Sequence, residues 1–136
     1  MKKKKPIIFI QDCGVWKQDV IVLVGGTKTD LLEFSKKVKA RKEIIKFLTE
    51  NDFFKGIRPT DLGAFCWEDE VRIAVLYLKP YQDSWEYWET LIHEIHHAVH
   101  VFSIQKGFEK EMEAQAYLQE YLFHRIRRKL QGVEKI

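Results

Sequence analysis

The strongest constraint on the fold is a long helical pattern in the second half of the chain, over residues 83–103. Its apolar positions recur three, four and seven residues apart, as in a helix with one broad apolar face. They are Trp85, Trp88, Leu91, Ile92, Ile95, Val99 and Phe102. Asp83 and Glu86 have the spacing of a capping box. We therefore predict a helix that begins at Asp83, ends near Ser103 and has Gly107 as its terminator.

Two short apolar runs near the start of the chain are rich in β-branched residues, Pro6–Gln11 and Asp19–Gly26. Both are predicted strands, and the second has the continuous apolar character of a buried one. The pattern then becomes helical over Asp30–Glu50, with apolar residues on one face and lysines on the other. Asp30 and Glu33 form a second predicted capping box.

A hairpin is expected next, because the apolar stretches Ala64–Glu68 and Val71–Leu78 follow a loop over Lys55–Gly63 and are separated by acidic Asp69. A final helix is predicted over Phe108–Leu130. The order β-β-α-β-β-α-α contains no repeat and no linker to a second domain. It predicts an α+β fold in which a small mixed sheet packs on two C-terminal helices, with one further helix from the N-terminal half.

The composition limits the class of protein. The 136 residues are 46% hydrophobic and 32% charged, which is typical of one globular domain over residues 1–136. The net charge of +3 does not by itself indicate a nucleic-acid partner. Basic residues cluster at both ends and over residues 36–42, where we expect solvated surface on one helix. Cys13 and Cys66 supply no disulfide framework and are expected to be reduced, as small buried hydrophobes.

The opening MKKKKPIIFIQDCG resembles an export signal, but its apolar run, Ile7–Ile10, is too short. No apolar stretch approaches the length of a membrane span. We therefore expect a cytoplasmic protein with no membrane partner.

The candidate chemistry lies inside the first helix described above, in the sequence TLIHEIHHAV. His93, Glu94 and His97 form an H-E-x-x-H frame. Residues four apart share one helical face, so the imidazoles of His93 and His97 can be directed at one zinc ion. Zinc lowers the pKa of a water that it holds to about 7, and Glu94 lies where a carboxylate can take that proton. His96 and His100 are expected to line the rim of a cleft or to face solvent.

A catalytic zinc needs a third protein ligand, and two candidates are open. His100 shares the face of His97, but ligands along one straight helix converge poorly on a tetrahedral centre. Glu113 is the better candidate, because Tyr117, Glu120 and His124 fall within about 40° of it on the final helix. Together they form one polar stripe, which a simply solvated helix face would also produce.

These motifs resemble the zincins, and more narrowly the gluzincins, in which a second helix supplies a glutamate ligand. HEIHH matches the first motif and EAQAY resembles the second, over Val71–His124. The resemblance implies a zinc metalloendopeptidase with His93, His97 and Glu113 as metal ligands and Glu94 as general base. The size also suits minimal gluzincins and the small metallopeptidase domains of mobile-element regulators. The first half of the chain, Met1–Asp61, matches no family.

The resemblance further implies that Val71–Leu78 is the strand bordering the cleft, with a peptide or protein substrate extended along it. We expect this strand at the edge of the sheet, just ahead of the Asp83 cap. A side chain should also stabilise the oxyanion. The candidates are His124 first, Tyr117 next and Tyr81 last, while Glu120 is a candidate to orient a ligand histidine.

Three functions compete at this stage. A zinc metallopeptidase is the leading hypothesis. The alternative is a catalytically silent zincin-like module that binds a protein partner, although a purely structural site has no use for Glu94. A basic nucleic-acid-binding protein is the third, but no nucleic-acid motif supports it and the aromatic residues are not interleaved with the basic runs.

Overall fold

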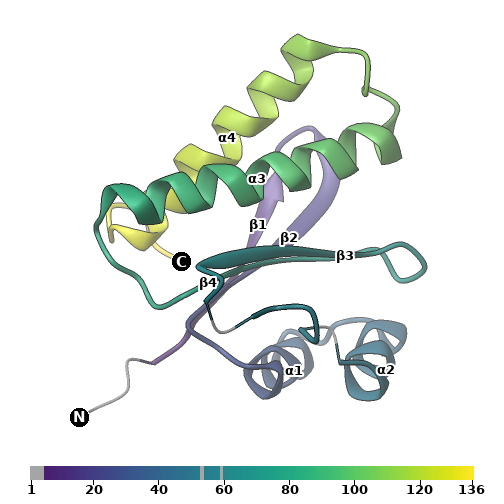
Figure 1. Ribbon diagram of the computed structural model, residues 1–136. Coiled ribbons are helices and arrows are strands. Elements are labelled where there is room, and N and C mark those ends of the chain that lie inside the picture. The colour runs from purple at the N-terminus through teal and green to yellow at the C-terminus, as the bar shows by residue number, and fades with distance from the viewer. Residues whose placement is uncertain (1–4, 53, 59) are drawn as a thin grey trace.

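The computed structural model describes residues 5–52, 54–58 and 60–136 (Figure 1). Most of the basic opening of the chain and Pro59 of the predicted loop lie outside these ranges. The strands are β1 (Ile7–Cys13), β2 (Trp16–Val24), β3 (Gly63–Glu68) and β4 (Ile73–Leu78). The helices are α1 (Lys28–Lys37), α2 (Lys42–Glu50), α3 (Trp85–Lys106) and α4 (Met112–Leu130). The predicted α+β class is therefore confirmed.

The four strands form one mixed sheet in the order β1-β2-β4-β3. β1 and β2 are antiparallel, β2 and β4 are parallel, and β3 and β4 form the predicted antiparallel hairpin. The expectation that Val71–Leu78 is an edge strand is wrong, because β4 is paired on both sides and β3 is the edge. The reason is visible in β4 itself: Ile73 and Val75 face one hydrophobic core while Ala74 faces the other. A strand that is apolar on both faces suits the interior of a covered sheet.

Helices cover both faces of the sheet. α3 and α4 lie side by side on one face, and α1 and α2 lie on the other (Figure 1). The larger core is on the α3 and α4 side, where Leu91, Ile95 and Phe102 of α3 are fully buried. The smaller core is formed by Leu31 of α1 and Leu48 of α2 with the strands. This packing fixes which side of α3 remains at the surface.

The predicted helix over Asp30–Glu50 is two helices. Its basic cluster is therefore divided between the end of α1, the connection and the start of α2. α1 ends at Lys37, and Lys39 adopts a left-handed conformation with φ 55° before α2 begins. The capping box is shifted as well: Thr27 is the N-cap, and Asp30 is its partner at the third position. Thr27 therefore supplies the hydroxyl that the backbone amide of Asp30 needs.

α3 is close to its prediction, with different ends. Ser84 rather than Asp83 caps it, accepting a hydrogen bond from the amide of Tyr87. Asp83 instead accepts a hydrogen bond from the indole Nε1 of Trp88 at 3.1 Å. The helix continues to Lys106, and Gly107 ends it at φ 79°, as expected of a left-handed C-cap. Of the predicted apolar face, Trp85 and Ile92 are exposed.

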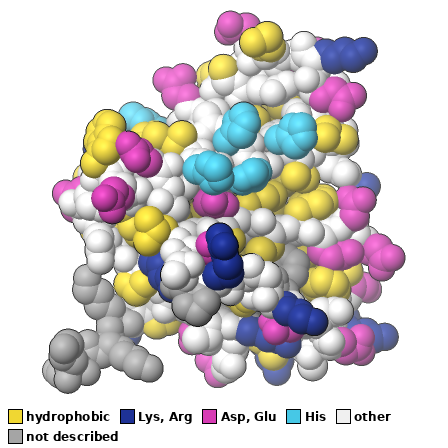
Figure 2. Space-filling model, viewed as in Figure 1, with side chains coloured by type: hydrophobic (Ala, Val, Ile, Leu, Met, Phe, Trp, Pro, Cys, Tyr) yellow, Lys and Arg dark blue, Asp and Glu magenta, His cyan; other side chains and the backbone are white. Residues whose placement is uncertain are grey.

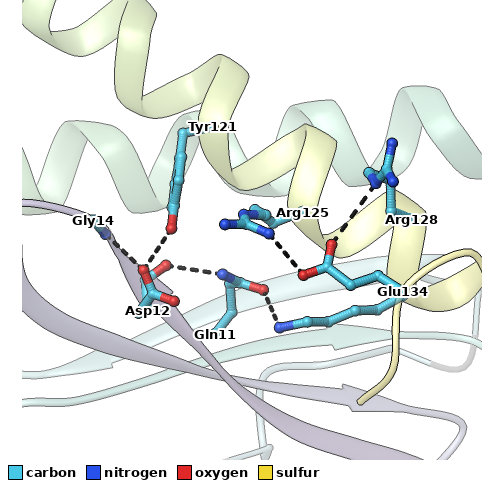
Figure 3. Close-up of polar contacts among 8 residues, drawn as sticks. Gln11, Asp12, Gly14, Tyr121, Arg125, Arg128 and Glu134 are labelled. Atoms are coloured by element: carbon cyan, nitrogen blue, oxygen red, sulfur yellow. Dashed lines mark hydrogen bonds and ion pairs between the residues drawn. The ribbon is translucent and has the colours of Figure 1, made fainter.

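α4 begins at Met112, four residues later than predicted, and a polar network fastens it to β1 (Figure 3). The hydroxyl of Tyr121 donates to Asp12 Oδ1 at 2.6 Å, and the ammonium of Lys129 donates to Gln11 Oε1 at 2.7 Å. The side chain of Gln11 is buried and hydrogen-bonded, so its contact with Lys129 fixes where α4 lies along β1. These contacts, with buried Leu118, set the rotation of α4 about its own axis.

Candidate metal centre

The histidine pair of α3 is assembled as the spacing predicts. The Nε2 atoms of His93 and His97 lie 3.2 Å apart, and the rings meet edge to face with centroids 4.8 Å apart. Both side chains are exposed, as are His96 and His100, which agrees with the prediction for those two. Figure 2 shows histidine side chains gathered in one patch over α3, with acidic side chains beneath them.

The pair fits the donor geometry of zinc. Two nitrogens that each lie 2.0–2.1 Å from a tetrahedral centre are about 3.3–3.4 Å apart. The observed separation of 3.2 Å is close to that value. Without a metal, the same distance allows one imidazole N–H to donate to the other ring, so both neutral and metal-bound forms suit this arrangement.

Glu94 differs sharply from the histidines around it in exposure. Its side chain is 9% exposed while that of His93 is 69% exposed, and Glu94 Oε1 lies 3.8 Å from His93 Nε2. Burial raises the pKa of the Glu94 carboxyl, and the nearby imidazoles of His93 and His97 partly offset that rise. A carboxyl that is largely desolvated beside two imidazoles is a suitable proton acceptor and donor.

One hollow of about 420 Å³ lies between α3 and the start of β3. His93 and Glu94 line it from the helix, and Asp61 and Gly63 line it from the other side. The approach is close because residue 63 is glycine: a Cβ there would lie 2.9 Å from Thr90 Cγ2 and 2.9 Å from the Tyr77 carbonyl oxygen. In the sequence Gly63 marks only the end of the predicted loop, although a glycine at the start of a strand often marks such an approach.

Asp61 is one of four carboxylates that line this hollow, with Glu86, Glu89 and Glu94, and the sequence did not single it out. Hydrogen bonds from the backbone amide and then the guanidinium of Arg58 lower its pKa. Its negative charge in turn contributes to raising the pKa of Glu94. The side chain of Asp61 is 24% exposed, so it is accessible from the hollow.

A second hollow, of about 700 Å³, separates α3 from α4 and also reaches His93. His96 and Val99 line it from α3, and Gln115 and Gln119 line it from α4. Gln119 donates from Nε2 to the Ile92 carbonyl at 3.1 Å, while its Oε1 is buried without a hydrogen-bond partner among the described residues. That oxygen is an available acceptor for an imidazole N–H, a contact that metal-bound histidines usually make.

No third ligand lies grouped with His93 and His97 among the described residues. Within the described ranges, no three His, Cys, Asp or Glu side chains form a group that could hold a metal. Glu113 is exposed in the first turn of α4, and that helix faces α3 through Gln115, Ala116 and Gln119. These three positions centre about 110° away from Glu113 around the helix. Glu113 as a ligand therefore stays a prediction.

The predicted oxyanion residues lie elsewhere. Tyr117, Glu120 and His124 line a separate hollow of about 230 Å³ with Tyr121 and Arg125, on an outer side of α4. None of them lines either hollow beside His93. Tyr81 packs at ring-centroid distances of 5.5 and 5.7 Å from Tyr87 and Trp88 near the start of α3. The polar stripe on α4 is thus real, but it is not directed at the histidine pair.

Neither Cys13 nor Cys66 forms a disulfide. Burial raises the pKa of Cys13 to about 12 and that of Cys66 to about 11. Both are therefore protonated at neutral pH and unreactive as nucleophiles. Cys66 lies near enough to Glu94 for the carboxylate charge to contribute to its shift.

Comparison with models of known protein families, with curated proteins and with solved structures finds no match for this chain. None of the helices in the described ranges combines the length and the apolar character that a membrane crossing requires.

Proposed function

We propose that this chain is a zinc-dependent metallopeptidase. The observation that supports this most directly is the His93 and His97 nitrogen pair at 3.2 Å with a buried carboxylate, Glu94, 3.8 Å from one of them. A solvated histidine-rich helix has no reason to bury a glutamate beside two exposed imidazoles, because burying a carboxylate is costly without a partner. A peptidase of the H-E-x-x-H type needs that combination.

Zinc, when bound by His93 and His97, supplies a Lewis acid that acidifies a water and polarises a carbonyl. Glu94 takes a proton from the attacking water as the new carbon–oxygen bond forms. It then passes that proton to the amide nitrogen as the carbon–nitrogen bond breaks. The raised pKa of Glu94 suits both steps, since it brings the pKa of the carboxyl closer to neutral pH.

Glu113 is the proposed third ligand, on the strength of its resemblance to the second gluzincin motif. Asp61 is its competitor, because it lines the same hollow as His93 and Glu94 and its charge contributes to raising the pKa of Glu94. Both candidates are carboxylates, which suit a catalytic zinc with two histidines. Gln119, in place of Glu120, is the proposed acceptor of a hydrogen bond from a ligand histidine, because its buried Oε1 accepts no other hydrogen bond among the described residues.

The proposed substrate is a peptide in extended conformation along the outer edge of β3. This strand has no neighbour on that side among the described strands, and its first residue borders the hollow beside His93 and Glu94. An extended peptide can add to such an edge through main-chain hydrogen bonds. β3 therefore replaces Val71–Leu78 as the proposed docking strand.

The test compares Glu94→Gln with Glu86→Gln. Glu86 is an exposed glutamate that lines the same hollow, about two helical turns before Glu94. Each purified protein is loaded with zinc, its zinc content is measured, and its cleavage of a library of unstructured peptides is followed by mass spectrometry. Glu94→Gln should keep its zinc and lose about 10²–10⁴ in rate, the usual scale for a lost general base. Glu86→Gln should keep both. Equal rates in the two variants would contradict the mechanism.

A catalytically silent module that binds a protein partner is the second candidate. It is favoured by one observation, namely that no third acidic or histidine ligand joins the pair among the described residues. This function predicts that the wild-type protein, with zinc confirmed, cleaves no peptide of the library. Glu94→Gln would then leave partner binding unchanged.

A further inference from the structure

A cavity of about 380 Å³ shares no lining residue with the hollows beside His93. Its walls come from strands β1, β2 and β4, from α1, α2 and the connection between them, and from the end of α3. The volume is within the range of small-molecule sites, about 300–1,000 Å³. Three strands and three helices thus border a concave space that the proposed peptidase does not use.

Positive charge is concentrated around this cavity. Its lining includes one carboxylate, Asp19, and four cationic side chains: Lys17, Arg41, Arg72 and Lys106. The surplus of three equals the formal net charge of the whole chain, +3. Four cationic side chains and one carboxylate at one concave site favour an anionic ligand.

The cations are not neutralised within the fold. Arg41 donates to the Val71 carbonyl at 2.7 Å, and Lys106 donates to the Lys17 carbonyl at 3.2 Å. In the described part of the chain, none of the four lies within 4.0 Å of a carboxylate oxygen as an ion pair. Backbone carbonyls orient these side chains without cancelling their charge, so the charge is available to a ligand.

Apart from the polar side chains of Gln18 and Ser35, the remainder of the lining is aliphatic and includes Ile10, Ile21, Val38, Ile44 and Ile73. No aromatic side chain is among the described residues that line the cavity. Nucleobases are usually bound by stacking on aromatic rings. The cavity is therefore better matched to a ligand with an aliphatic body than to a nucleotide.

Arg72 occupies a backbone position that favours glycine. Its φ of 54° is in the left-handed region, which costs an L-residue with a Cβ more than it costs glycine. Lys39 has a similar φ of 55° but does not line the cavity. The two residues therefore form a matched pair, since a change to glycine relieves the strain of the positive φ at either position and removes one cation.

We propose that this cavity binds a small organic phosphate monoester. The phosphate lies between the cations, foremost Arg41 and Arg72, and the aliphatic body lies against the isoleucines. A phosphate carries about −1.5 to −2 charge at neutral pH, so it matches several cations better than a single carboxylate does. Guanidinium groups also bind phosphate oxygens in pairs.

The test is calorimetric titration of the full chain with hexyl phosphate, inorganic phosphate, hexanoate and hexanol. Hexyl phosphate should bind most tightly, inorganic phosphate and hexanoate at least about tenfold more weakly, and hexanol not at all. Arg72→Gly should weaken hexyl phosphate binding about tenfold or more, as loss of one charge-assisted contact does. Its melting temperature should stay equal or rise, because glycine suits the backbone there. Lys39→Gly should change affinity less than about twofold.

Other outcomes would overturn the proposal. Equal weakening in Arg72→Gly and Lys39→Gly would show only general attraction to a basic surface. If Arg72→Gly lowered the melting temperature as well as the affinity for hexyl phosphate, the result would indicate a structural role for Arg72. Vesicles containing phosphatidic acid provide the last arm: adsorption to them without binding of soluble hexyl phosphate would identify a membrane-surface patch instead of an enclosed site.

Discussion

α3 and α4 lie against each other on one face of the sheet, yet they present their polar residues in different ways. α3 turns His93 and His97 outward and keeps Glu94 buried between them and the sheet. α4 turns Tyr117, Glu120 and His124 toward a hollow of its own. Its side nearest to α3 carries Gln115, Ala116 and Gln119 instead.

The geometry within a helix and the geometry between helices have separate causes. The spacing of His93 and His97 is set by the hydrogen-bonded repeat of one helix, so it does not depend on how α4 packs. The rotation of α4 is set by its contacts, including buried Leu118 and the Tyr121 hydrogen bond to Asp12. Metal ligation by α3 alone is therefore a firmer expectation than ligation shared between both helices.

The largest effect should come from removing a histidine of the pair. His97→Ala is expected to weaken zinc binding more than about 100-fold, because loss of an outer-shell partner alone costs about 10–100-fold. His124→Ala, on α4, should leave the affinity within about twofold. Competition titration with a zinc-sensitive chelator measures both. Comparable losses in the two variants would mean that α4 contributes to the site after all.

The third ligand can be identified by comparing Glu113→Gln with Asp61→Asn. If Glu113 is the ligand, its change should weaken zinc binding by at least the roughly 10–100-fold that loss of an outer-shell partner costs, and Asp61→Asn should have little effect. The reverse result would assign the third ligand to the loop before β3. Unchanged affinity in both would leave a two-histidine site, which would favour the silent module. Circular dichroism of each variant separates lost ligation from lost folding.

These comparisons show where the sequence was sufficient. The H-E-x-x-H spacing and Gly107 are local features, and both are present as predicted. The interior position of β4 was missed, although its continuous apolar run already indicated burial on both faces. The break between α1 and α2 had no such signal, because Lys39 occupies the left-handed position where glycine would have marked it. The rotation of α4 depends on distant contacts and could not be read from its helical wheel.

Gly63 allows a test of how closely β3 must approach α3. Gly63→Ala would bring a Cβ within 2.9 Å of Thr90 and of the backbone of β4, which is too near for an ordinary contact. We expect destabilisation by about 1–3 kcal/mol, the usual cost of overpacking. Gly56→Ala is the control, since a Cβ there meets nothing within 4 Å. Chemical denaturation measures both, and equal stability of the two variants would contradict the close approach.

The smallest expected effect concerns the contact that sets the rotation of α4. The Tyr121 hydroxyl is the largest cause of the lowered pKa of Asp12, followed by the amide of Gly14. Asp12 thus binds its proton less tightly in the folded chain than in the unfolded chain. Its ionisation stabilises the fold above the ordinary carboxyl pKa, and this contribution is lost as the pH falls through the lowered value.

Tyr121→Phe removes that hydroxyl and keeps the ring. At neutral pH it should cost under about 1 kcal/mol, since Asp12 is exposed and solvent screens its charge. The difference from wild type should shrink as the pH falls and Asp12 is protonated in both proteins. Tyr117→Phe, one helical turn away and exposed, should show no such dependence. Urea denaturation at several pH values provides the measurement. A penalty for Tyr121→Phe that is constant with pH would mean that the hydroxyl acts through packing, and the rotation of α4 would then rest on its buried leucines alone.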